Sequence, residues 1–145
     1  MIALIQRVSR AEVRVGERLA GAIAHGIVAL VAVRRADAPS DAERLLQRLL
    51  GYRIFADTAG RMNLDLRAVS GGLLLVPQFT LAADTARGMR PGFSTAAAPE
   101  QAHRLFAHLV EQARLAHASV ASGEFGAHMQ LSLINDGPVT FWLET

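Results

Sequence analysis

The chain has 145 residues, of which 51% are hydrophobic and 19% are charged, so it can bury the core of one compact domain. All 15 basic residues are arginine, and lysine and cysteine are both missing. Lysine Schiff bases, phosphate-loop lysines, thiol nucleophiles, disulfides and cysteine-ligated metals are therefore excluded. A formal net charge of only +2 does not indicate a strongly cationic nucleic-acid binder, but it leaves room for arginine contacts with phosphate.

The N-terminal part of the chain predicts strands. Ile2 to Val8 is a mostly apolar run, and from Arg10 to Val15 charged residues alternate with apolar ones, as in a strand with one buried face. Residues 16–18 suit a hairpin turn that returns the chain into a strand over Leu19 to Ile23. The continuous apolar run Ile27 to Val33 predicts a buried strand, and its seven residues fall far short of the roughly 20 that span a bilayer.

The first helix is predicted to begin at a capping box. Ser40 and Glu43 have the S-x-x-E spacing of such a box, and Pro39 stands just outside it. Gly51 is expected to end the helix. Apolar residues at helical spacing form the stripe that should face the core: Ala42, Leu45, Leu46, Leu49 and Leu50.

Short strands and a loop are predicted in the middle of the chain. Tyr52 to Ala56 and Met62 to Leu66 are two short strands, and the strongly apolar run Gly71 to Leu81 is a third. Pro77 interrupts this run, and since proline has no N–H group for a central ladder, it should mark the end of the strand or an edge. Residues 85–98 carry two glycines and a proline and predict a loop.

A second helix and two final strands complete the predicted fold. Pro99 suits the first turn of the helix, and Met129 to Asn135 and Val139 to Leu143 predict strands joined through Asp136-Gly137-Pro138. The helix should bury a stripe of Ala102, Leu105, Phe106, Leu109 and Ala113. We therefore expect one α/β (α+β) domain over residues 1–145, in which two helices cover a mixed, mainly antiparallel sheet.

No familiar catalytic or metal-binding signature is present. The sequence contains no nucleophile elbow, no phosphate-binding loop and no dinucleotide-binding glycine motif. The histidines never occur at the i,i+4 spacing that places two ligands on one helix face. We expect them at the surface or in ordinary packing, without a metal: His25, His103, His108, His117 and His128.

Two segments are chemically unusual for their place in the predicted fold. Pro77 to Thr80 puts polar and aromatic residues at the end of a buried strand, and Asn135 to Thr140 puts a Gly-Pro between two strands. Each also has a purely structural interpretation. The first would be a proline at a strand edge beside a hydrogen-bonded glutamine, and the second an ordinary hairpin turn.

Motifs along the whole chain resemble one known family. They are, in order, Gly51-Tyr52-Arg53-Ile54-Phe55, Met62-Asn63-Leu64, Pro77-Gln78-Phe79-Thr80-Leu81, Arg87-Gly88-Met89-Arg90-Pro91 and Asn135-Asp136-Gly137-Pro138-Val139-Thr140. Together they resemble the bacterial-type D-aminoacyl-tRNA deacylases, and the similarity runs nearly from Met1 to Thr145. The resemblance implies a cytoplasmic homodimer that cleaves the ester between a D-amino acid and the 3′ end of tRNA. Its active site would lie at the subunit interface, with no metal, no cofactor, and no DNA or membrane partner.

The same resemblance assigns the selection of substrates. Gly137 and Pro138 match a cis Gly-Pro peptide that enters the active site of the partner subunit and rejects L-amino acids. Glycine has no side chain to reject, so glycyl-tRNA should be cleaved as well. Arg7 interrupts an apolar strand; either it supports the Gly-Pro carbonyl groups across the interface or it is simply exposed.

The catalytic centre is expected at Gln78, Phe79 and Thr80. The backbone N–H groups of Phe79 and Thr80 would stabilise an oxyanion while Gln78 orients the substrate. The Thr80 hydroxyl as nucleophile is one alternative, and we favour the other, attack by water assisted by the 2′-hydroxyl of the terminal ribose. Pro77 stands where many members of the family have serine, so a serine nucleophile is excluded at this position.

Arginines are the expected contacts with tRNA. Arg87 and Arg90 lie in the glycine-containing loop, and Arg34-Arg35 is a second candidate pair, although each could equally be a solvated surface charge. Two other functions stay open from the sequence. One is a non-catalytic dimeric RNA-binding module of the same fold, and the other is a metal-dependent hydrolase.

Overall fold

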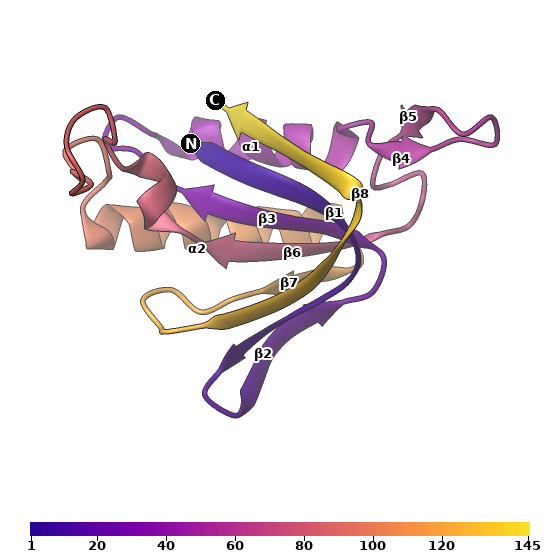
Figure 1. Ribbon diagram of the computed structural model, residues 1–145, viewed down its shortest axis with the longest axis horizontal. Helices are drawn as coiled ribbons and strands as arrows, with labels where there is room; N and C mark the ends of the chain where they lie inside the picture. The colour runs from indigo at the N-terminus through magenta and orange to yellow at the C-terminus, as the bar shows by residue number, and fades with distance from the viewer.

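Six strands form one curved sheet, and two helices lie against it (Figure 1). The computed structural model describes residues 1–145. The strands of the sheet are β1 (Ile2–Val15), β2 (Arg18–Ile23), β3 (Gly26–Ala32), β6 (Gly72–Pro77), β7 (Val120–Ser122) and β8 (Gln130–Glu144). Strand β1 pairs antiparallel with β2, β3 and β8, whereas β3–β6 and β6–β7 are parallel, and a separate antiparallel pair consists of β4 (Phe55–Ala56) and β5 (Met62–Leu64). The predicted α/β (α+β) fold, with a mixed and mainly antiparallel sheet, is confirmed.

Strand β1 organises the sheet because it has three partners. Its first half, from Ile2 to Val8, pairs with β3, its second half, from Ala11 to Val15, pairs with β2, and β8 follows it along both halves. The two final strands predicted from the sequence are therefore one element of 15 residues. The alternative interpretation of residues 136–138 as an ordinary hairpin turn is wrong, because the two halves of β8 pair with β1 and not with each other.

Both helices cover the same face of the sheet (Figure 1). Helix α1 spans Pro39–Gly51 and helix α2 spans Pro99–Ala116, and every residue predicted for the two apolar stripes is buried. They pack on alternate residues of β1, β3 and β6, so the main core lies between the helices and the sheet. Neither helix contains a segment long and apolar enough to cross a membrane.

The start of α1 differs from the prediction. The N-cap is Ala38, Pro39 is the first helical residue, and the carboxylate of Asp41 accepts the N–H of Ala38 at 2.9 Å. The predicted box of Ser40 and Glu43 is wrong, because proline has a fixed φ suited to the first helical position and places Asp41 at the third. Glu43 instead pairs with a histidine of α2.

The opposite face of the sheet holds a second, smaller core. It consists of Val8, Ala11, Val13, Ile23, Val28, Leu74 and Val76, with the first half of β8 packed against it. Strands β3 and β6 are therefore buried on both faces, which explains why their sequences are continuous apolar runs rather than alternating ones. The curvature also brings β2 close to β7, since a Cβ on Gly21 would lie 2.9 Å from the carbonyl oxygen of Ser122.

Strands β3 and β6 approach closely at the Gly26–Gly72 pair, which supplies a test of the fold. A methyl group on Gly26 would lie 2.0 Å from the carbonyl oxygen of Gly72. Gly26→Ala is therefore expected to lower the free energy of unfolding by about 3 kcal/mol, because the strands must separate to admit it. Denaturant unfolding measures the change.

A matched glycine serves as the control for this substitution. A Cβ on Gly51, the last residue of α1, would meet nothing within 4 Å. Gly51→Ala is expected to shift stability by less than about 1 kcal/mol. Wild-type stability in Gly26→Ala would contradict the close approach of β3 and β6.

Candidate active site

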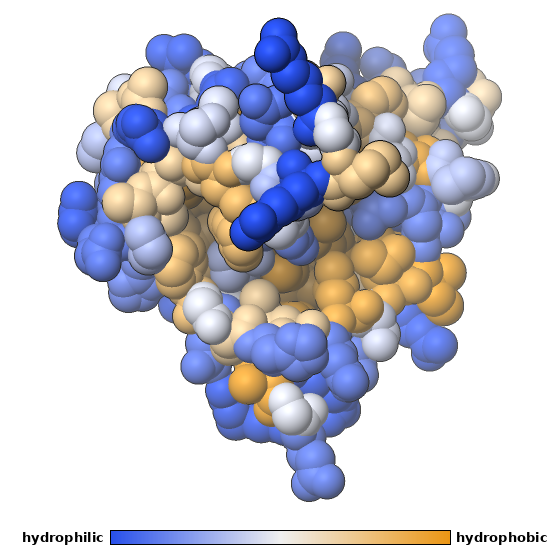
Figure 2. Space-filling view, turned by 60° about the vertical axis from the view of Figure 1, so that its left-hand side comes forward, coloured by the Kyte–Doolittle hydropathy of each residue, from blue (hydrophilic) through white to orange (hydrophobic).

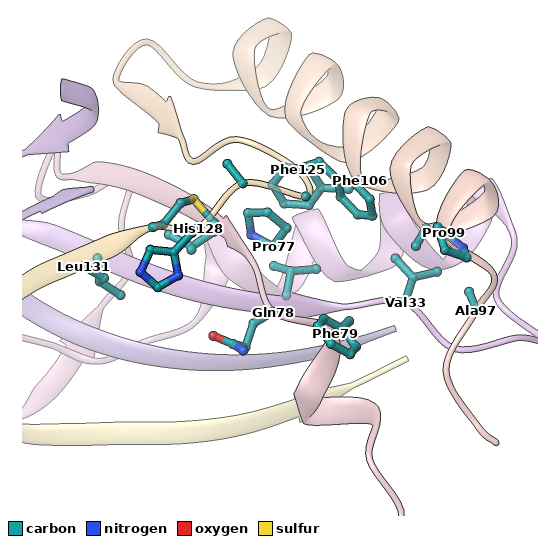
Figure 3. Close-up of a pocket in the computed structure, with 16 residues that line it drawn as sticks. Val33, Pro77, Gln78, Phe79, Ala97, Pro99, Phe106, Phe125, His128 and Leu131 are labelled. Carbon is teal, nitrogen blue, oxygen red and sulfur yellow. The ribbon is translucent and has the colours of Figure 1, made fainter. Parts of the chain in front are cut away.

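A cavity of about 480 Å³ opens at the carboxyl ends of β3 and β6. These strands are parallel, so both end at the same edge of the sheet, where α2 begins. The space-filling view shows a hollow bordered by apolar side chains on this side of the molecule (Figure 2), and the close-up shows the side chains that line the cavity (Figure 3). Eleven of the 16 lining residues are hydrophobic, a composition typical of small-molecule sites.

The predicted catalytic segment lies at this cavity, which Gln78 and Phe79 both line (Figure 3). Strand β6 ends at Pro77, as predicted, and a 3₁₀ turn then spans Phe79–Ala82. Between the two, the N–H of Gln78 donates to a carbonyl oxygen of β3 at 2.7 Å, which anchors the segment to the sheet. A helical turn leaves its first N–H groups without partners inside the turn, so those of Phe79 and Thr80 lie at its open end.

Thr80 is hydrogen-bonded to Gln78. The Nε2 of Gln78 donates to the Oγ1 of Thr80 at 2.5 Å, and the threonine itself is exposed beside the cavity rather than lining it. Phe79 is 58% exposed, and its ring is tilted against that of Phe93 with 5.1 Å between the centroids. The predicted catalytic segment therefore contributes one ring, that of Phe79, to an exposed aromatic pair.

The loop that carries Arg87 and Arg90 follows the 3₁₀ turn and leads into Phe93. It is closed by a bridge between Asp84 and Gly92, which exchange backbone hydrogen bonds of 2.7 and 2.9 Å. Both arginines are exposed, and the ion pairs of the chain involve other arginines. The fold thus leaves two guanidinium groups free to meet an anion.

The guanidinium group of Arg34, in contrast, already has hydrogen-bond partners within the chain. It donates to a carboxylate oxygen of Glu144 at 3.1 Å and to the carbonyl oxygen of Thr145 at 2.6 Å. A hydrogen bond from Trp142, together with the charge of Arg34, holds the pKa of Glu144 below its usual value. Arg34 therefore ties the segment after β3 to the end of β8, whereas Arg35 is exposed.

The Gly137–Pro138 peptide is cis and lies in a bulge of β8, where both residues are exposed. Arg7 stands opposite the bulge on β1. Its Nε donates to the carbonyl oxygen of Asp136 at 2.8 Å, and its Nη1 donates to that of Ile54 at 2.6 Å. The side chain of Arg7 is only 14% exposed, so simple surface exposure does not account for this residue.

The single chain does not bring the two predicted parts of the site together. The bulge lies beside Arg7, which pairs with Ile27 at the start of β3, whereas Pro77 pairs with Val31 near the end of β3. Val31 lies four residue steps beyond Ile27 in extended chain, roughly 13 Å along the strand. The bulge and the predicted catalytic segment thus lie toward opposite ends of the sheet.

The cavity is also lined by side chains for which the sequence predicted no role in the site. Phe125 and His128 come from the connection between β7 and β8 and line the cavity together with Gln78 (Figure 3). Phe125 packs against His103 and Phe106 of α2, with ring centroids 5.1 and 6.4 Å apart. No spacing in the sequence links this connection to the end of β6, so only the fold shows that they meet. The structure contains no cluster of three histidine, aspartate or glutamate side chains that could hold a metal ion.

Comparison with known proteins assigns the chain to a family. Residues 4–144 match the family model described as D-Tyr-tRNA(Tyr) deacylase. This chain belongs to that family. A relative from Paraburkholderia phymatum, named D-aminoacyl-tRNA deacylase, is 59% identical over 150 residues, with 100% of this chain and 99% of the relative covered. A relative of the same name from Burkholderia mallei is 58% identical with the same coverage.

Two solved structures share the fold of this chain. A protein named c-Myc DNA unwinding element binding protein has a TM-score of 0.95 at 35% identity, with 100% of this chain and 99% of that chain covered. A probable eukaryotic D-amino acid tRNA deacylase has a TM-score of 0.88 at 15% identity, with 99% and 98% covered, which shows the fold alone.

Proposed function

We propose that this protein hydrolyses the ester bond of D-aminoacyl-tRNA and releases free tRNA and the D-amino acid. The observation that carries the proposal is the segment from Gln78 to Thr80 at an apolar cavity, in a member of the D-Tyr-tRNA(Tyr) deacylase family that is 59% identical to a named D-aminoacyl-tRNA deacylase. The proposed reaction uses hydrogen bonds from backbone N–H groups and a hydroxyl group of the substrate, and it needs no metal or cofactor. A tRNA substrate also fits a cytoplasmic location.

Backbone N–H groups form the proposed oxyanion site. Water adds to the ester carbonyl carbon and gives up a proton while negative charge develops on the carbonyl oxygen. The bond to the ribose oxygen then breaks, and this oxygen takes up the proton as it leaves. The N–H groups of Phe79 and Thr80, at the open end of the 3₁₀ turn, hold the charged oxygen, and one such donor typically lowers a barrier by about 3 kcal/mol. The 2′-hydroxyl of the terminal ribose, which RNA carries and DNA lacks, assists the water.

Thr80 positions groups in this proposal and is not the nucleophile. A hydroxyl that attacks needs a base to take its proton. The Oγ1 of Thr80 accepts the Nε2–H of Gln78, and no histidine or carboxylate is hydrogen-bonded to it. The Gln78–Thr80 contact instead fixes the glutamine side chain at the edge of the cavity.

The Gly137–Pro138 segment of a second subunit selects the substrate in the proposed homodimer. The segment is exposed in the single chain and lies toward the opposite end of β3 from the cavity, so it can act only on a site other than its own. Its carbonyl oxygens meet an L side chain, whereas a D side chain points away and glycine has none. Arg7 supports the segment from within its own subunit through the carbonyl oxygen of Asp136.

Arg87 and Arg90 are the proposed contacts with the tRNA backbone. Both are exposed in the loop whose Phe93 touches Phe79, so they can reach phosphates next to the esterified nucleotide. Because the formal net charge is only +2, the protein contacts the end of the tRNA rather than its whole surface. The affinity for tRNA falls as the salt concentration rises.

The first test is release of amino acid from charged tRNA. The purified protein is expected to discharge D-tyrosyl-tRNA and glycyl-tRNA and to leave L-tyrosyl-tRNA intact, because only the L side chain meets the selecting carbonyl groups. Labelled amino acid released over time is the measurement. A shift in tRNA mobility without any release would identify a non-catalytic RNA-binding module, and loss of activity with a chelator would identify a metal-dependent hydrolase.

Thr80→Ala tests the role of the hydroxyl. The single-turnover rate on D-tyrosyl-tRNA is expected to stay within about threefold of wild type, since the substitution removes a side chain but keeps the backbone N–H. Thr58→Ala, in the exposed turn between β4 and β5, is the matched control. A folded but inactive Thr80→Ala protein would show that catalysis requires the hydroxyl and would contradict this role of Thr80.

Subunit mixing tests whether the site is shared between chains. Pro138→Ala alters the selecting segment and keeps Gln78, whereas Gln78→Ala removes the catalytic side chain and keeps the segment. The first variant alone is expected to cleave both D- and L-tyrosyl-tRNA. An excess of exchanged Gln78→Ala subunits should restore selectivity, because each intact Gln78 then faces an intact segment. Unchanged cleavage of L-tyrosyl-tRNA in the mixture would rule out selection by the partner subunit.

A further inference from the structure

The bulge in β8 is large for the length of β1 that it faces. Gln6 pairs with Thr140 and Val8 pairs with Asn135, so the four residues 136 to 139 of β8 stand opposite the single residue Arg7. Over this stretch the regular ladder between the strands is interrupted, so other groups must satisfy and hold the backbone.

The side chain of Asn135 joins the beginning of the bulge to its end. Its Oδ1 accepts the N–H of Val139 at 2.6 Å, and its Nδ2 donates to the carbonyl oxygen of Val139 at 3.3 Å. The carboxamide therefore pairs with both backbone groups of Val139, as a neighbouring strand would. Asparagine suits this place because a short side chain must offer one acceptor and one donor; aspartate at neutral pH has no donor.

We call the paired hydrogen bonds between Asn135 and Val139 the clasp. A further contact connects the clasp to β1. The Nδ2 of Asn135 also donates to the Oγ1 of Thr140 at 3.0 Å, and the Nε2 of Gln6 donates to the same oxygen at 3.3 Å. The start of the bulge is held separately, where Arg7 bonds the carbonyl oxygen of Asp136. The clasp thus controls the end of the bulge that Arg7 does not reach.

We infer that Asn135 is a positioning residue that sets the place of the Gly137–Pro138 segment and thereby the discrimination between D- and L-aminoacyl-tRNA. The inference rests on the proposed function, in which this segment acts by exclusion. If its carbonyl oxygens move back, an L side chain is no longer rejected, whereas cleavage of the D substrate does not depend on them. Loss of the clasp therefore raises activity on L-tyrosyl-tRNA rather than lowering activity on D-tyrosyl-tRNA.

Two substitutions at position 135 test the inference. Asn135→Ala removes the whole clasp, and Asn135→Asp keeps the acceptor for the N–H of Val139 but removes the donor. In Asn135→Ala, kcat/KM for L-tyrosyl-tRNA is expected to rise by about tenfold or more and kcat/KM for D-tyrosyl-tRNA to stay within about threefold. For Asn135→Asp, kcat/KM for L-tyrosyl-tRNA is expected to lie between the values of Asn135→Ala and wild type. If the alanine variant does not fold, the aspartate variant alone tests the inference.

The control separates lost position from lost stability. Val110→Ala removes part of a buried side chain of α2, a helix that carries no residue of the clasp, and is expected to lower stability without changing the ratio of D to L activity. A wild-type ratio in a folded Asn135 variant, or an equal loss on both substrates, would overturn the inference while the proposed function stands. A wild-type protein that discharges neither substrate would overturn the proposed function and the inference with it.

Discussion

The pairing of β8 with β1 along its full length is the constraint on which the rest of the structure depends. The first half of β1 pairs with β3 and its second half pairs with β2. Strand β8 pairs with β1 along both halves. The register of β8 differs between the two halves, so the extra residues must leave the sheet where the halves meet, opposite Arg7. The location of Gly137–Pro138 is therefore a consequence of strand pairing and not of a local turn.

The direction of the strands then separates the two parts of the candidate site. Strand β1 runs antiparallel to β3, so Arg7 lies beside the start of β3, whereas the parallel pair β3–β6 delivers Pro77 and the cavity to the other end. Because both parts are fixed to the paired strand β3, a rearrangement of loops cannot bring the bulge to the cavity of the same chain. The proposed function accordingly needs a second copy of the chain, whose exposed Gly137–Pro138 segment supplies what the cavity lacks in its own subunit.

Patterns that depend on one buried face could be predicted from the sequence, and features that depend on competition between elements could not. The stripes of α1 and α2 and the alternation from Arg10 to Val15 reflect burial alone, and all three elements are present. Asp136-Gly137-Pro138 is a turn signal locally, yet β1 is long enough to pair with the residues on both sides of it. Strand β7 has only three residues and shows no period that a sequence pattern could reveal.

The candidate site divides in the same way. The segment from Gln78 to Thr80 could be selected because polar residues at the end of a buried strand are chemically unusual, but its neighbours Phe125 and His128 come from a distant connection. The proposed chemistry also requires no lysine or cysteine side chain, so the absence of both residue types does not prevent catalysis. Main-chain N–H groups survive every substitution at positions 79 and 80 except proline, whereas the clasp on the selecting segment depends on one carboxamide. Stabilisation of the oxyanion in this proposal is therefore robust to changes of the side chains at positions 79 and 80, whereas a single substitution in the clasp can remove selection against L-amino acids.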